Sequence, residues 1–237
     1  MERTLGPNID WTPCEPPVIG ELIANRRAQS PRSFASAVVL KARQAWLPFY
    51  TDHFLIDATL HGVAGVERAL LLHGRSGTYW LDGQARPIHV VNALEELELT
   101  EGTVLDYVRY FLYSMRGDQG AFVLIESPDE ITASDPATGT EAGPTSLESI
   151  RGLWVPLRLD GVAQDGRLGV EATVAYADGL YASSFAVQVD GEIEMRDDRP
   201  LAQLAGFQAP DCAILVARPE DPEPPKAASG PTLEQAL

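Results

Sequence analysis

Cysteine and long apolar runs are scarce in this sequence. Its two cysteines, Cys14 and Cys212, cannot build a disulfide framework, and no Cys-x-x-Cys spacing is present. No apolar run approaches the ~20 residues that a membrane-spanning helix needs, and the N-terminal region lacks the apolar segment of a signal peptide. We therefore expect a cytoplasmic protein with reduced thiols and no membrane partner.

The familiar catalytic signatures are also missing. The sequence contains no GxxxxGK[ST], no GxGxxG behind a predicted strand and no HExxH. The segment Gly74-Arg75-Ser76-Gly77 resembles a nucleophile elbow, but Thr78 stands where the GxSxG motif requires glycine. These absences argue against a Rossmann or P-loop enzyme. We expect no cofactor and no metal, and whether the chain is an enzyme stays open.

Lysine is nearly absent, because only Lys41 and Lys226 are lysines among the 18 basic residues. Together with the many alanines, this arginine-rich composition is typical of a GC-rich bacterial genome, and we expect a bacterial source. Apolar residues make up 45% of the chain. That fraction predicts a packed core rather than global disorder.

Acidic residues are missing from one stretch of an acidic chain. The net charge is −16, yet no Asp or Glu occurs from Leu22 to Thr51. The stretch carries +5, so the remainder carries −21; its basic residues are Arg26, Arg27, Arg32, Lys41 and Arg43. The pI near 4.5 argues against binding to nucleic acid, whose phosphates would be repelled.

Two interpretations of this basic stretch stay open. Residues 33–47 predict an N-terminal helix that ends at Pro48. In the interpretation that we favour, this helix packs on a sheet and its basic residues pair with the surplus carboxylates. In the other, bidentate contacts hold an anionic ligand, and the arginines concerned are Arg26, Arg27, Arg32 and Arg43.

Proline and glycine indicate how the chain is divided. In chain order we predict an irregular Pro-rich arm (1–30), a single α+β domain (31–218) and a disordered, acidic, Pro-rich tail (219–237). The central domain divides alternatively into two β-rich halves, 31–99 and 100–218. Residues 128–149 form either a mobile lid or a flexible insertion, and their composition favours the insertion.

The predicted fold class is α+β, with antiparallel sheet meanders packed against one long amphipathic helix (103–115) and the second, N-terminal helix. Strand-like segments occur at 53–61, 66–73, 78–81 and 84–91, and then at 122–126 and 154–159. A hairpin over 168–189 follows, with Asp178-Gly179 as its two-residue turn, and it places alternate apolar residues on one face. Asp190-Gly191-Glu192 predicts a three-residue loop into the next strand.

The four histidines, His53, His61, His73 and His89, all lie in the first meander. His53 and His61 are about 26 Å apart along one strand, too far to share an ion. His73 and His89 approach each other across the sheet if the strand between them is short. With Asp57 they are the candidates for acid–base chemistry, although a strand histidine is more often a hydrogen-bonded structural residue.

A run of glutamates precedes the predicted helix 103–115. We expect these carboxylates to form a solvated acidic patch that the helix dipole favours. The residues concerned are Glu95, Glu96, Glu98 and Glu101.

Two functions fit these observations. The one we favour is a non-catalytic accessory module that binds another protein or itself, because catalytic signatures are missing and the acidic Pro-rich ends suit partner recognition. The alternative is a small-molecule binding protein or enzyme with a pocket between helix and sheet. There His73, His89 or Asp57 would supply the polar group, and the basic stretch would hold an anionic ligand.

Overall fold

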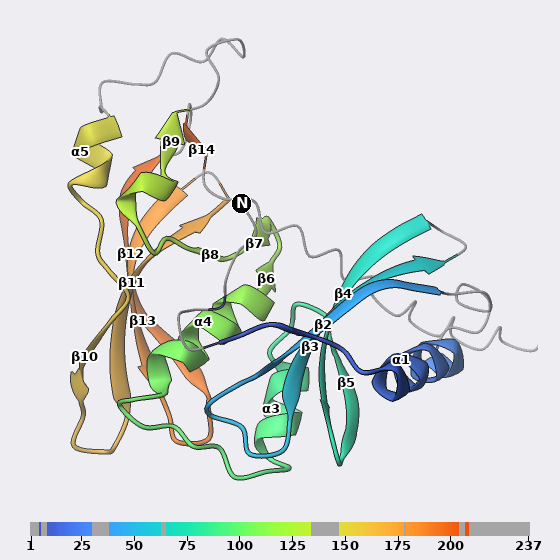
Figure 1. The fold of residues 1–237 in the computed structure, drawn as a ribbon. Helices are drawn as coiled ribbons and strands as arrows, with labels where there is room; N and C mark the ends of the chain where they lie inside the picture. The colour runs from blue at the N-terminus through green and yellow to red at the C-terminus, as the bar shows by residue number, and fades with distance from the viewer. Residues whose placement is uncertain are drawn as a thin grey trace, which may run out of the picture.

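The described part of the chain contains two five-stranded antiparallel sheets, and the first is built from the N-terminal part (Figure 1). A computed structural model describes residues 5, 9–29, 38–62, 65–133, 147–177, 179–203 and 207–208. The sheet contains β1 (Thr12–Pro13), β2 (Val38–Trp46), β3 (Phe54–Gly62), β4 (Gly65–Gly74) and β5 (Gly77–Leu81), hydrogen-bonded in that order. Each strand pairs with its neighbour in sequence, as expected for a meander.

The second sheet follows the central helix. It contains β8 (Val123–Leu124), β10 (Arg158–Val162), β11 (Leu168–Tyr176), β12 (Gly179–Val187) and β13 (Ile193–Gln203), with β10 to β13 in order and β8 paired to β11. Two short ribbons complete the strands: β6 (Arg116–Gly117) with β7 (Gly120–Ala121), and β9 (Thr132–Ala133) with β14 (Phe207–Gln208). The predicted α+β class with antiparallel sheets is confirmed.

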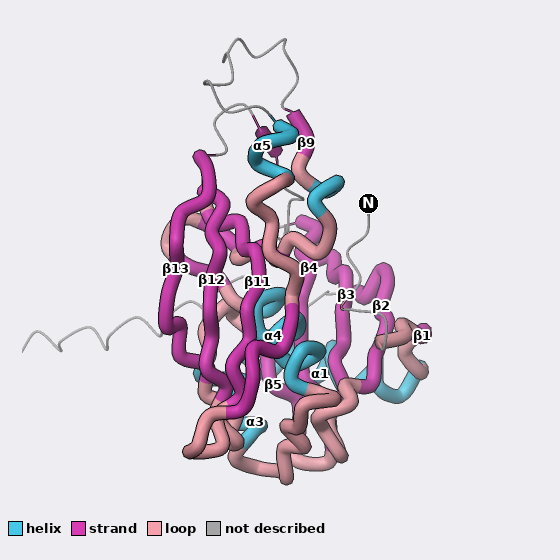
Figure 2. The backbone as a smooth tube through the Cα atoms, turned by 90° about the vertical axis from the view of Figure 1, so that its left-hand side faces the viewer, coloured by secondary structure: helices cyan, strands magenta, loops and turns pink. Residues whose placement is uncertain are grey.

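Helices lie around and between the sheets. They are α1 (Pro16–Gln29), α3 (Arg86–Asn92), α4 (Val104–Ser114) and α5 (Leu147–Arg151), with a 3-10 turn, η1, at Pro128–Glu130. Figure 2 shows α4 between β11–β13 on one side and β2–β4 on the other. The helix predicted over 103–115 is present as α4, with Thr103 and Met115 as its caps. None of the helices in the described segments is both long and apolar enough to cross a membrane.

The first sheet buries both faces against different partners. Ile56, Ala58 and Leu60 alternate along β3 and pack in one cluster with Leu22 of α1. The opposite face contributes residues such as Leu55 to the main core, which also contains buried side chains of α4 and of the second sheet. Side-chain alternation along a strand produces this division.

The prediction of an N-terminal helix over residues 33–47 is wrong. Within it, residues 38–46 form β2, which pairs along its length with β3; residues 33–37 lie outside the described part of the chain. Pairing with a strong neighbouring strand overrides a helical spacing of apolar residues. The N-terminal helix is instead α1, which falls inside the stretch expected to be irregular.

Residues 84–91 were expected to form a strand, and this prediction is also wrong, because α3 occupies Arg86–Asn92. In α3, as in α1, proline lies in the first turn: Pro87 in one helix, Pro16 and Pro17 in the other. A first-turn proline loses no hydrogen bond, since the N–H it lacks has no intrahelical partner there.

The long hairpin has the predicted faces with a shifted register. Tyr176 pairs with Gly179, so the two-residue turn begins at Ala177, whose φ is +53°. A two-residue shift keeps the same side chains on the same face. The next loop also begins one residue early, because the Gln188 N–H donates to the Glu192 carbonyl over 2.9 Å.

Of the insertion predicted at 128–149, η1, β9 and α5 are described, while 134–146 and the tail 219–237 lie outside the described residues.

Candidate functional site

Strand register gathers charged side chains on the α4-facing side of the first sheet. Arg43 on β2 is paired with Asp57 on β3, and in the next row Lys41, Thr59 and Arg68 are aligned across β2, β3 and β4. Residues two apart on a strand share a face, so the two rows are adjacent. These five residues line a pocket of about 220 Å³, which we call the basic pocket.

Asp57 is the centre of this arrangement, and its side chain is 6% exposed. Arg68 donates from Nε to Oδ1 over 2.7 Å and from Nη2 to Oδ2 over 2.6 Å. Arg43 donates from Nε to Oδ2 over 2.9 Å. One buried carboxylate thus orients two guanidinium groups, the first of them through the bidentate geometry that planar guanidinium favours.

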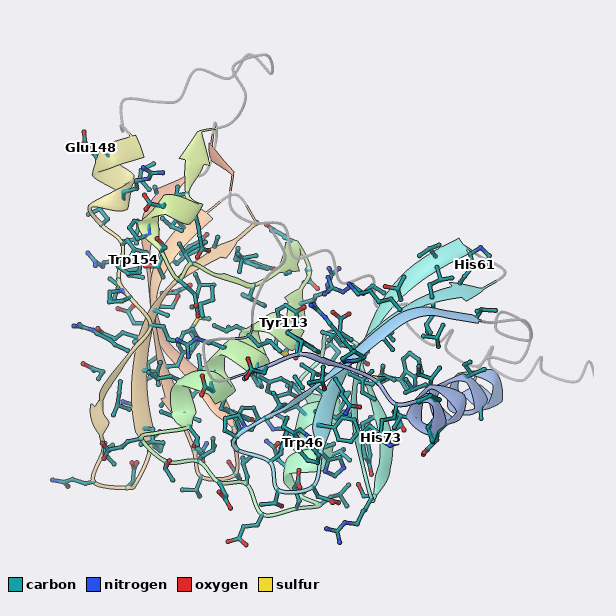
Figure 3. All side chains as sticks on the ribbon, in the orientation of Figure 1. Trp46, His61, His73, Tyr113, Glu148 and Trp154 are labelled. Carbon is teal, nitrogen blue, oxygen red and sulfur yellow. The ribbon has the colours of Figure 1, made fainter. Side chains whose placement is uncertain are left out.

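Contacts outside the pocket hold both arginines further. The Arg43 guanidinium carbon lies 4.3 Å from the ring centroid of Trp11, a cation–π contact. Arg68 Nη2 donates to the Tyr113 hydroxyl over 3.1 Å. Tyr113 stands at the end of α4 nearest the first sheet (Figure 3), so this bond connects the pocket to the helix between the sheets.

The charges around Asp57 decide its ionisation. Burial by itself raises the pKa of the Asp57 carboxyl, but hydrogen bonds and charge from Arg68, and then from Arg43, outweigh burial and leave the pKa below its ordinary value. Asp57 is therefore a carboxylate at neutral pH, and it acts as a structural anion rather than as a proton donor.

The lining residues carry a positive surplus in a strongly acidic chain. Lys41, Arg43 and Arg68 contribute +3 and Asp57 contributes −1, giving +2. The volume is smaller than the 300–1,000 Å³ typical of drug-sized ligands. The arrangement therefore suits a phosphate or carboxylate group, bound by guanidinium and ammonium donors.

The predicted anion-binding arginines do not form one site. Arg43 lines the basic pocket, whereas Arg26 and Arg27 belong to α1, which packs on the opposite face of the sheet. Arg32 lies outside the described residues. Arg68 was missed because its place beside Asp57 becomes visible only when β3 and β4 are aligned.

His73 and His89 are not brought together. His73 Nδ1 is 2.8 Å from Thr78 Oγ1, and its Nε2 is 3.8 Å from Glu21 of α1. His89 lies on α3, with its ring 6.3 Å from that of Phe111 on α4. Figure 3 shows His73 far from His61, at the other end of the sheet. Within the described ranges, no three His, Cys, Asp or Glu side chains are grouped to hold a metal ion.

Comparisons with known proteins add no assignment: no protein-family model, curated protein or solved structure matches this chain significantly.

Proposed function

We propose that this protein binds a small anionic ligand, a phosphate or carboxylate compound, in the basic pocket. The observation that carries the proposal is the alignment of Lys41, Arg43 and Arg68 around Asp57 in a concavity of the sheet. It favours the small-molecule alternative over the accessory module that the sequence alone favoured.

The pocket is organised before a ligand arrives. Asp57 and Trp11 hold Arg43, while Asp57 and Tyr113 hold Arg68. Side chains that are already ordered lose less conformational entropy when they bind. Lys41 is exposed, and its ammonium faces the anion from the solvent side of the pocket. Thr59 adds a hydroxyl that donates or accepts.

Thermal unfolding with added anions tests the proposal. The wild-type chain is heated with sodium phosphate, pyrophosphate or succinate, against sodium chloride of equal ionic strength. An anion at 100 times its dissociation constant stabilises the folded state by about 2.7 kcal/mol. We expect Lys41→Gln to lose this shift without losing its fold, because Lys41 is exposed.

Arg158→Gln is the matched control. Arg158 is a surface cation of the second sheet, paired with Glu171 over 2.5 Å, and its loss removes the same charge from the chain. The proposal predicts that this variant keeps the anion-dependent shift. A wild-type chain that none of the three anions stabilises beyond chloride, or a Lys41→Gln variant that shifts like wild type, contradicts it.

The accessory, protein-binding function stays a second proposal, together with a cytoplasmic location and a bacterial source. Exposed apolar side chains at one end of the first sheet favour it: Val38, Leu40 and Val66 are each more than half exposed. Affinity purification from the native cell tests it, with a Val38→Asp/Val66→Asp variant as control. A partner retained equally by both forms argues against this surface.

A further inference from the structure

A second cluster lies where the start of β3 meets the β4–β5 turn. His53 Nε2 is 2.8 Å from Ser76 Oγ, and His53 Nδ1 is 2.9 Å from Glu95 Oε1. The side chains of His53 and Glu95 are 1% and 6% exposed, whereas Ser76 is exposed. The expectation that Glu95 belongs to a solvated acidic patch is therefore wrong.

The hydrogen bonds around the cluster are compatible with the proton arrangement that a triad needs. Glu95 Oε2 accepts from the Asp52 N–H over 2.7 Å and from Thr51 Oγ1 over 3.2 Å, as an ionised carboxylate does. Its Oε1 faces His53 Nδ1, and in the tautomer with the proton on Nδ1 the other nitrogen, Nε2, accepts from Ser76 Oγ. The Tyr79 hydroxyl lies 3.2 Å from Ser76 Oγ and 3.3 Å from the Ser76 carbonyl oxygen, and it donates to this residue.

The fold brings these residues together through strand pairing. Phe54 and His73 are paired across β3 and β4, so His53 lies beside the tight turn Gly74–Gly77 that carries Ser76. A Cβ on Gly74 would lie 2.7 Å from a carbon of the His53 ring. Glycine at this position therefore allows the imidazole to pack directly on the turn backbone.

We propose that Ser76, His53 and Glu95 form a nucleophilic triad that hydrolyses carboxylic esters. A serine hydroxyl bonded to an imidazole whose other nitrogen is held by a carboxylate is the arrangement that activates serine in acyl transfer. This site is separate from the basic pocket, with which it shares no residue, and it does not depend on anion binding there.

The chemical steps balance without a cofactor. Ser76 Oγ attacks the ester carbonyl carbon and its proton passes to His53 Nε2. The tetrahedral intermediate collapses, the bond to the alcohol oxygen breaks, and the His53 proton passes to the leaving alcohol. Water then attacks the acyl-Ser76 carbonyl, His53 again takes and returns the proton, and the carboxylic acid leaves. Glu95 stabilises the imidazolium in both halves and fixes its tautomer.

Covalent labelling tests this proposal. The purified full chain is incubated with a fluorophosphonate probe, the modified peptide is identified by mass spectrometry, and p-nitrophenyl acetate hydrolysis is followed in parallel. We expect the label on Ser76 and none in Ser76→Ala. Glu95→Gln, checked for its fold by near-ultraviolet circular dichroism, is expected to slow labelling about 10²- to 10⁴-fold, because His53 then loses the tautomer in which it acts as general base.

Ser127→Ala serves as the matched control. Ser127 also has a bonded hydroxyl, which accepts from the Asp129 N–H at the start of η1, and its loss is expected to leave labelling unchanged. Ser76 lies on an exposed turn, so Ser76→Ala keeps the test valid even where the buried substitution at Glu95 unfolds the chain. Wild type that reacts no faster than Ser76→Ala shows that the cluster only holds the turn, and overturns the proposal. Equal labelling rates for wild type and folded Glu95→Gln overturn the triad as well.

Discussion

Asp57 is the single residue on which the basic pocket depends. It is buried, and it is bonded to two arginines from the strands on either side. A buried ion pair contributes little net stability, because desolvation offsets the attraction, yet removing one partner leaves the other charge uncompensated. The value of Asp57 is therefore best measured by removing its charge alone.

Asp57→Asn is expected to lower the free energy of unfolding by about 2–3 kcal/mol. This is less than the roughly 3–5 kcal/mol for breaking a fully buried pair, because the Arg68 side chain is 33% exposed and keeps part of its hydration. Urea unfolding at pH 7 measures the change. Asp52→Asn, which loses a carboxylate paired with the exposed Arg75, is the control and is expected to lose clearly less stability than Asp57→Asn, because a surface ion pair contributes little. Equal losses in the two variants would contradict the prediction.

The same residue predicts a pH dependence with a definite sign. The pKa of Asp57 is lower in the folded protein than in the unfolded chain, where it is about 3.9. The stabilisation is fully present above about pH 4–5 and is lost as the pH falls through the lower, folded pKa. The stability difference between wild type and Asp57→Asn is therefore expected to shrink as urea unfolding is repeated from pH 6 down to pH 3. A difference that stays constant over this range argues against the Asp57 contacts.

At the level of elements, α1 and α3 show how proline starts a helix in this chain. In α1 the N–H of Ile19 donates to the carbonyl of Glu15 over 3.2 Å, ahead of Pro16 and Pro17. An exposed glycine, Gly20, lies within the helix, and a Cβ there would meet nothing within 4 Å. A side chain at position 20 would therefore change the helix propensity without disturbing any packing contact.

Gly20→Ala is expected to stabilise the protein by up to about 1 kcal/mol, because alanine loses less backbone entropy in a helix than glycine. Chemical denaturation measures the change. Gly77→Ala provides the contrast: Gly77 begins β5 with φ +130°, a conformation that strains any L side chain, and this variant is expected to be less stable than wild type. Destabilisation by Gly20→Ala would argue against helix at this position.

The elements also show which sequence signals were sufficient to predict strands and their buried faces. Alternating polarity predicted β3, β4, β5 and the faces of the β11–β12 hairpin, because burial on one face imposes the period of two. Hairpin register was shifted by two residues, since such a shift preserves those faces and only the turn distinguishes the alternatives. The apolar pattern over residues 38–46 led to the wrong prediction of a helix, because a short run of apolar residues is compatible with either helix or strand until its pairing partner is known.

The candidate sites, too, were predictable from the sequence only in part. Arg43 and Asp57 are recognisable from charge and pattern, but their contact needs the β2–β3 register. His53 and Glu95 are 42 residues apart in sequence, and Glu95 reads as one acidic residue among several. The Ser76 turn does not match the elbow motif. Its environment depends on long-range pairing, which local sequence does not encode.

At the scale of the molecule, a buried polar network connects the segment before β3, α3 and α4 to the β12–β13 loop of the second sheet. Tyr50 donates to Asn92 Oδ1 over 2.6 Å, and Asn92 Nδ2 donates to Tyr107 on α4 and to the carbonyl of Asp190. Tyr107 donates to the Gly191 carbonyl over 2.7 Å. Satisfied networks of this kind specify one arrangement of the groups they join, so we expect residues 31–218 to unfold as a single domain rather than as two halves.

Gly191→Ala tests that expectation at the point where the network meets the β12–β13 loop. Gly191 has φ +82°, and a Cβ there would run into the side chains of Asn92 and Tyr107. The substitution therefore combines backbone strain with displacement of the network. We expect a loss of about 2–5 kcal/mol, made up of about 1–2 kcal/mol for the backbone and about 1–3 kcal/mol for buried groups left without partners.

Gly166→Ala separates the two causes, because Gly166 has φ +83° but no atom within 4 Å of its Cβ position. Gly166→Ala is therefore expected to lose only the stability that backbone strain costs.

Trp80 on β5 and Trp154 beside the second sheet report on the two halves through single-tryptophan variants. In a cooperative molecule Gly191→Ala moves both unfolding midpoints together, because the two halves share one core. A shift confined to the Trp154 signal would show that the halves unfold independently, and the network would then be a local feature of the second sheet.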